Sequence, residues 1–154
     1  MMRQQWTLGG WVLLGLLLLA AAGRADEAAA VMAIKSLGGK VTLDDNQPGK
    51  PVVGVELNFN TKDTNVGLTE LKQLKSLQTL NLDSAKITDA GLKELKELKS
   101  LQTLLLQGTL VTDAGLKELK ELRNLQTLDL RGTKVTDAGV KELKAALPKI
   151  DIQR

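Results

Sequence analysis

Acidic side chains are the residues of this sequence best suited to chemistry, and three of them recur at a fixed spacing. Asp89, Asp113 and Asp137 are 24 residues apart, and a threonine precedes each one. If successive units stack at the strand spacing of about 5 Å, these carboxylates form a row. The row predicts either a cation site or a set of helix caps, and we favour caps, because Thr or Asp oxygens accept the free N–H groups of a first helical turn without any ligand.

The composition argues against a catalytic centre. The 154 residues include no Cys and no His, which excludes disulfides, thiolate or imidazole metal ligands and the common nucleophile–base pairs. Catalysis would then need paired or metal-holding carboxylates, whereas Glu56, Asp83 and Asp129 fall on separate expected strands. We therefore predict that the protein is not an enzyme and has no cofactor and no metal.

The charge and the aromatic content bear on possible partners. The formal net charge of +3 falls by two, to +1, without Arg3 and Arg24 of the N-terminal segment. Nucleic-acid binders usually present a basic field or aromatic rings on which bases stack. The chain has no Tyr, and Phe59 is its single aromatic residue after position 25. We expect a monomer with a protein partner and no nucleic-acid partner.

Residues 1–25 have the layout of a secretory signal peptide. Arg3 gives a positive start, residues 11–22 form an uncharged apolar run, and small residues at Gly23 and Ala25 precede a cut ahead of Asp26. Extended back to Leu8, the run has 15 residues, whereas crossing a bilayer takes roughly 20. We predict cleavage after Ala25 and export to the periplasm or the extracellular space. The alternative is a retained N-terminal anchor, which alone would place the protein at a membrane.

A repeated unit occupies the rest of the chain. Residues 77–98, 101–122 and 125–143 align with one another at an offset of 24 residues, and residues 66–71 share this register. Residues 52–57 fit the same strand pattern at an offset of 25. The sequence therefore contains about four units, and a single unit cannot bury its apolar stripes without neighbours.

Each unit has the form L-x-x-L-x-L-x-x-[N/T]-x-[I/V]-T-D-A-G-L-x-E-L-x-x-L, which resembles the leucine-rich repeat family over residues 52–152. The T-D-A-G-L segment is similar to the subgroup in F-box-type receptors and in bacterial extracytoplasmic repeat proteins. The resemblance implies an α/β fold, a right-handed solenoid with a parallel concave sheet and convex helices, and a role in protein recognition. It also implies that Asn60, Thr109 and Thr133 bond the turn backbone between coils, so Ala85 predicts a looser or hydrated turn.

The residues support this architecture independently. Leu80 and Leu82 alternate like the buried side of a strand, and Leu92, Leu95 and Leu98 recur every three residues, which favours a helix or a tighter helical turn. The glycines of the T-D-A-G segments indicate close packing of helix against strand. The alternating Lys and Glu residues of the helical segments indicate a solvated convex face.

We predict three regions: a signal peptide over residues 1–25, an N-terminal capping helix, strand and loop over residues 26–51, and the repeats with a C-terminal cap over residues 52–154. Pro148 is expected to end a helix before a short strand at residues 150–152.

The candidate protein-binding residues lie between the inward leucines of each strand, where the repeats differ most. Leu105 is the one large apolar residue among them and predicts the centre of an interface. The candidates are Glu56, Asn58, Thr79, Asn81, Asp83, Thr103, Leu105, Gln107, Thr127, Asp129 and Arg131. We predict an exported protein-binding module, with a structural or self-assembling envelope protein as the alternative and an F-box-like receptor as a remote one. The sequence does not identify the partner, its affinity, the process or the type of envelope.

Overall fold

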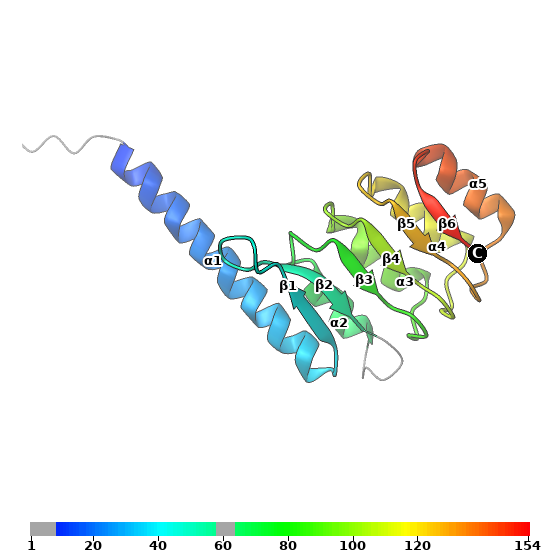
Figure 1. The fold of residues 1–154 in the computed structure, drawn as a ribbon, viewed down its shortest axis with the longest axis horizontal. Coiled ribbons are helices and arrows are strands. Elements are labelled where there is room, and N and C mark those ends of the chain that lie inside the picture. Colours follow the sequence, from blue (N-terminus) through cyan, green and yellow to red (C-terminus); the bar gives the residue numbers. More distant parts are fainter. Residues whose placement is uncertain (1–8, 58–63) are drawn as a thin grey trace, which may run out of the picture.

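The computed structural model describes residues 9–57 and 64–154. A long helix, α1 (Gly9–Ser36), lies at one end of a stack of strand–helix units, and the stack ends at β6 (Asp151–Gln153) (Figure 1). Two short strands, β1 (Lys40–Leu43) and β2 (Val52–Glu56), and helix α2 (Thr64–Leu71) follow α1. Asn58 and Asn60 fall outside the described residues.

The strands form one six-stranded sheet in sequence order. Strands β3 (Thr79–Asn81), β4 (Thr103–Leu105) and β5 (Thr127–Asp129) pair in parallel with their neighbours, and β2 and β6 join the same ladder. Gly54 pairs with Thr79, an offset of 25, and Thr79 pairs with Thr103, an offset of 24. The α/β solenoid with a parallel sheet is therefore confirmed, including the register change between the first two units.

Strand β1 departs from the expected all-parallel sheet. It pairs antiparallel with β2, with Lys40 opposite Glu56 and Thr42 opposite Gly54. The short connection over residues 44–51 explains this direction, because a parallel neighbour would need a crossover of a dozen or more residues. Strand β1 is therefore the edge strand of the sheet, next to β2 of the first unit.

The core consists of the repeating leucines. Leu80, Leu104 and Leu128 from the middle of the strands are fully buried, and so are Leu82, Leu106 and Leu130. Leu92, Leu95 and Leu98 meet them from the helical side. Because every unit contributes the same two stripes, the core is continuous along the stack.

The helical segments change type with the spacing of their leucines. Two units continue a four-residue α-turn as a 3-10 helix: α3 (Asp89–Leu92) with η1 (Lys93–Glu97), and α4 (Asp113–Leu116) with η2 (Lys117–Glu121). Leucines every three residues suit a 3-10 helix, because residues i and i+3 eclipse there. Helix α5 (Asp137–Ala146) remains α-helical, and its buried Leu143 and Leu147 are four residues apart.

The capping interpretation is confirmed for Thr112 and Thr136 and is wrong for Thr88 and for the aspartates, which do not cap their own helices. Asp89 accepts hydrogen bonds from the backbone N–H and the hydroxyl of Thr112 in the next unit, at 2.8 and 2.7 Å. Asp113 accepts the same pair from Thr136, at 2.7 and 2.6 Å. The threonines provide the caps, since the hydroxyls of Thr112 and Thr136 accept from N–H groups of the first turn. We call the bonds Asp89–Thr112 and Asp113–Thr136 the aspartate ladder.

The glycines of the T-D-A-G segments serve this ladder and not the helix–strand packing that the sequence predicts. A Cβ atom at Gly139 would lie 2.2 Å from Asp113 Oδ1, and one at Gly115 would lie 2.4 Å from Asp89 Oδ1. Both positions are therefore restricted to glycine by the carboxylate of the preceding unit. In the described part of the chain, no group of three or more acidic side chains could hold a metal ion.

The turns after the strands differ between units. The hydroxyls of Thr109 and Thr133 donate to the carbonyls three residues earlier, both at 2.7 Å, so these bonds lie within a turn and not between coils. Ala85 keeps the backbone bond of that turn at 3.1 Å and is buried, so the predicted looser turn is wrong. Ser84 there adopts φ of 58°, where Gly108 and Gly132 stand in the later units.

The N-terminal helix covers the first unit. Ala30 and Ile34 of α1 are fully buried in the common core. The predicted cleavage point after Ala25 lies within α1, and cleavage remains a prediction. No helix in the part of the chain that the structure describes is both long enough and apolar enough to cross a membrane.

Candidate protein-binding surface

The strand register positions the candidate residues in columns on the concave face of the sheet. Gly54, Thr79, Thr103 and Thr127 are paired neighbours, and the next column consists of Glu56, Asn81, Leu105 and Asp129. Asp83, Gln107 and Arg131 follow the ends of their strands. Because the residues between them are the buried leucines, every candidate that the structure describes lies on the side opposite the core.

A hollow of about 520 Å³ opens on this face at the N-terminal end of the sheet. Leu105 is half-buried and borders it, together with Asn81 and the exposed Thr79. The remaining lining comes from β1, β2 and the start of β3: Lys40, Val41, Thr42, Val53, Gly54, Val55, Glu56 and Gln78. Leu105 is the largest apolar side chain of the lining, which also contains three valines among its polar residues, and such a mixture suits the centre of an interface.

Strand β1 lines part of this hollow, which the sequence pattern did not predict. Thr42 is paired with Gly54 in the neighbouring strand, and a Cβ atom on that glycine would lie 3.0 Å from the Thr42 Cβ. Lys40 forms an ion pair with Glu56 at 3.5 Å across the same strand pair. The sequence predicted a strand and a loop within residues 26–51, and only the shortness of that loop could have indicated the antiparallel pairing.

Asp129 and Arg131 form the strongest polar contact of the surface. The Nε atom of Arg131 lies 3.0 Å from both carboxylate oxygens of Asp129, and Nη2 lies 2.5 Å from one of them. The Asp129 side chain is 5% exposed, whereas that of Arg131 is 53% exposed. The hydrogen bonds from Arg131 lower the pKa of Asp129 and its carboxylate raises the pKa of Arg131, so both groups stay charged.

Asp129 is therefore not the exposed contact residue that the sequence predicts. The guanidinium two residues later folds back over it, and the carboxylate holds Arg131 in place. The exposed member of the pair is the arginine, with a fixed orientation.

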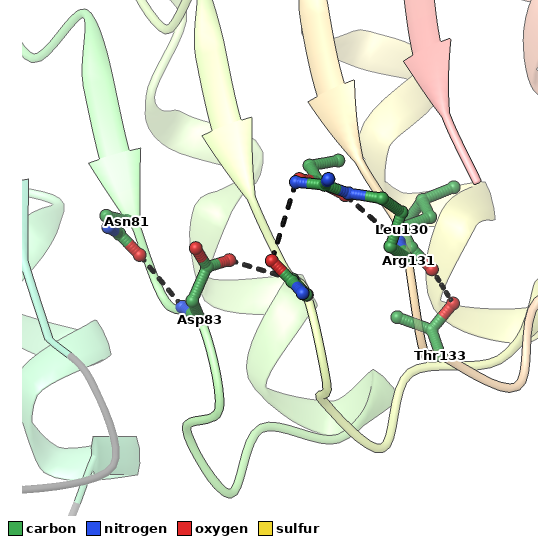
Figure 2. Close-up of polar contacts among 7 residues, drawn as sticks. Asn81, Asp83, Leu130, Arg131 and Thr133 are labelled. Carbon is green, nitrogen blue, oxygen red and sulfur yellow. Dashed lines mark hydrogen bonds and ion pairs between the residues drawn. The ribbon is translucent and has the colours of Figure 1, made fainter.

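A chain of hydrogen bonds links three units across the ends of the strands (Figure 2). Asn81 Oδ1 accepts from the Asp83 backbone N–H at 2.9 Å, and Asp83 Oδ1 accepts from the Gln107 N–H at 2.8 Å. Arg131 Nη2 then donates to Gln107 Oε1 at 3.4 Å. Burial raises the pKa of Asp83, with Asp129 adding to the effect and the Gln107 bond opposing it. These hydrogen bonds hold the side chains of Asp83, Gln107 and Arg131 in place in the absence of a partner.

Comparison with known proteins agrees with this geometry. A sequence profile described as Leucine Rich repeat matches residues 73–96 and 121–144. These two segments of the chain are leucine-rich repeats. No curated protein matches its sequence.

Several solved structures resemble this chain. An internalin from Listeria monocytogenes is 29% identical, with a TM-score of 0.48 over 55% of this chain and 24% of that one. A leucine-rich repeat protein of Leptospira interrogans is 30% identical, with a TM-score of 0.46 over 56% of this chain and 21% of that one. The structure of the Mex67:Mtr2 subunits of Chaetomium is 20% identical, with a TM-score of 0.54 over 65% of this chain and 78% of that one. At this identity the match shows a shared fold.

The chain thus covers less than a quarter of the length of the two bacterial proteins. Leucine-rich repeat domains generally bind proteins and are usually non-catalytic.

Proposed function

We propose that this protein is exported and binds a protein partner through the concave face of its sheet. The observation that carries the proposal is the contrast between the two sides of each strand. In β3, β4 and β5 the inward side repeats leucine and the first outward column repeats threonine, whereas the columns of Asn81 and Asp83 change from unit to unit. Leu105 and Asn81 of the changing positions border a hollow. A spacer without a partner has no need of such differences.

The chemistry of the concave face suits a partner surface of mixed character. Thr79, Thr103 and Thr127 offer a row of hydroxyls at the strand spacing of about 4.8 Å. Leu105 supplies an apolar contact in the adjacent column, and Arg131 supplies a fixed cation at the far end. A buried apolar anchor with polar groups around it concentrates binding energy at few positions.

Export is supported by the leader. Its short positive start, apolar run and small residues before Asp26 fit a signal peptide. Trp6 and Trp11 are the only two tryptophans, and the chain has no Tyr. Cleavage after Ala25 therefore gives a product with almost no absorbance at 280 nm and an intact mass that begins at Asp26. Tryptophan fluorescence in the exported product would indicate a retained anchor.

A matched pair of substitutions tests the binding face. Leu105→Arg places a charge in the hollow, and Leu110→Arg makes the same change at a leucine that is 51% exposed outside the sheet. Both full-length variants are expressed with the natural leader, cross-linked in the native envelope and captured through a C-terminal tag. We expect Leu105→Arg to abolish the capture of partners that the unsubstituted chain retains and Leu110→Arg to keep it. The opposite result would assign binding to the wrong surface, and concentration-dependent oligomers on a sizing column would favour a self-assembling protein.

A further inference from the structure

Basic side chains follow the edge of the solenoid where each helical segment returns to the next strand. They form two rows, one at the ends of the helical segments and one in the loops that follow. The first row is Lys72, Lys96, Lys120 and Lys144, and the second is Lys75, Lys99, Arg123 and Lys149. We call these eight residues the basic edge. Lys120 is half-buried and the other seven are exposed.

The charge of the basic edge differs from that of the remaining chain. The four segments 72–76, 96–100, 120–124 and 144–149 contain eight cations and two carboxylates, Glu97 and Glu121, which gives a net charge of +6. Residues 26–154 together carry +1, so everything outside these segments carries −5. A surface that only keeps a protein in solution intersperses both signs, whereas here one sign is gathered at one edge.

Two adjoining hollows bring cations of three successive units together. One of about 580 Å³ is bordered by Lys99, Lys120 and Arg123, with Glu121 and Asn124. The other, of about 450 Å³, shares Lys120 and Arg123 with the first and adds Lys149. Its remaining lining is apolar: Leu125, Ala146, Leu147, Pro148 and Ile150.

Few of these cations are neutralised within the molecule. Lys99 pairs with Glu121 at 3.0 Å, which lowers the pKa of that carboxyl, and Lys120 pairs with Glu142 at 2.5 Å. Arg123 and Lys149 form no ion pair with any described side chain. Their charges therefore remain available to an anion from outside, in a hollow that apolar residues also line.

We propose that the basic edge binds a linear anionic glycan that runs along the stack. Cations repeat there at the strand spacing of about 5 Å on a rigid scaffold, so a polymer with repeated carboxylate or sulfate groups engages several of them at once and releases its counterions. The exposed Ala146 and Pro148 in the hollow that Arg123 and Lys149 share offer an apolar contact to the C–H face of a sugar ring. Nucleic acid is disfavoured because the basic edge has no aromatic side chain on which bases could stack.

This site is separate from the concave face, so the two can be occupied together. The glycan would hold the protein at an envelope surface and leave the sheet open to its protein partner. Neither proposal depends on the other, because no residue of the basic edge borders the concave hollow.

Titration of the full-length chain with a fluorescent heparin oligosaccharide at several salt concentrations tests the proposal. Arg123→Gln with Lys149→Gln removes the two unpaired cations. Lys86→Gln with Lys134→Gln removes the same charge from exposed positions outside the basic edge. We expect the first double variant to bind about tenfold more weakly and to lower the slope of log Kd against log salt by about two. The second should bind like the unsubstituted chain.

Three results would overturn the proposal. One is no binding at low salt, a second is an equal loss in both double variants, and a third is equal or tighter binding of single-stranded DNA or polyglutamate of the same charge. If Arg123→Gln with Lys149→Gln alters the circular dichroism spectrum, Lys72→Gln with Lys75→Gln replaces it at the other end of the edge, with the same expected direction.

Discussion

The aspartate ladder and the concave face come from the same repeat but use polar side chains in opposite ways. In the ladder, Asp89 and Asp113 each bond the equivalent threonine of the next unit. On the concave face, Asp129 bonds Arg131 within its own unit. The bonds that cross units there join different residue types, since Asp83 accepts from the Gln107 N–H and Gln107 accepts from Arg131. The same contact can be repeated at successive junctions only if the same two residue types recur, as aspartate and threonine do in the ladder. A side chain whose partner is local, or external, is free to differ.

The largest predicted effect is a difference in stability between substitutions on the two faces of strand β4. Leu104 is fully buried and Leu105 next to it lines the concave hollow. Leu104→Ala should lower the free energy of unfolding by roughly 2–5 kcal/mol, the range for a buried leucine. Leu105→Ala should cost about 1 kcal/mol or less, since part of its side chain is already in water. Urea denaturation measures both, and equal losses would mean that the inward and outward positions are misassigned.

The second effect concerns the ladder. Gly139→Ala places a methyl group against the Asp113 carboxylate, so we expect a loss of about 1–3 kcal/mol from overpacking. Adding Asp113→Ala removes the atom in conflict, so the double variant should lose less than the sum of the single variants. Strict additivity in a thermal-melt cycle would show that glycine is required for another reason.

A third, smaller effect lies in the turn of the second unit. Ser84 has a left-handed backbone conformation, and the equivalent positions of the later units are glycines, Gly108 and Gly132. Ser84→Gly should therefore raise the free energy of unfolding by about 1 kcal/mol, the cost of that conformation for a residue with a Cβ atom. Gly108→Ser is the reverse control and should lower it by a similar amount. A destabilising Ser84→Gly would contradict this view of the turn.

The smallest effect is a pH dependence of opposite sign in the two regions. The bonds from Thr136 lower the pKa of Asp113, so its contribution is present above the unfolded pKa of about 4 and is lost as the pH falls through the folded value. Burial raises the pKa of Asp83, so its ionised form costs stability once the pH exceeds the unfolded pKa.

Asp113→Asn should therefore destabilise the protein at pH 7, and Asp83→Asn should stabilise it slightly. Both differences should shrink towards pH 2–3, where the carboxyls are protonated. Thermal melts at the two pH values measure them, and a stabilising effect of Asp113→Asn at neutral pH would be incompatible with the ladder.

The repeat made much of the fold predictable from sequence. Leucines at two-residue and three-residue spacing gave the strands, the core and the tight helical turns, because burial imposes those periods. The sequence also indicated the offset of 25 residues between the first two strands of the repeat, which the pairing of Gly54 with Thr79 confirms. These features depend on which residue types recur, and a single sequence shows that directly.

The candidate site was less predictable, because its contacts depend on individual atoms. Spacing placed Asp129 in an outward column, but the return of Arg131 onto it buries the carboxylate. Spacing also identified the aspartate row, but not that each carboxylate reaches the following unit, 23 residues on. The contribution of β1 to the hollow depends on its antiparallel pairing, and nothing in the repeat specifies that.

The aspartate ladder also determines how such a protein can change its length. Both junctions of the ladder have a carboxylate on one side and a threonine with a nearby glycine on the other. Duplicating or deleting one whole 24-residue module within the ladder would therefore join compatible surfaces, whereas a shorter insertion between a bonded aspartate and its threonine would change their spacing of 23 residues. Gene rearrangements in multiples of the module can thus enlarge or shrink the binding face without a new interface having to evolve.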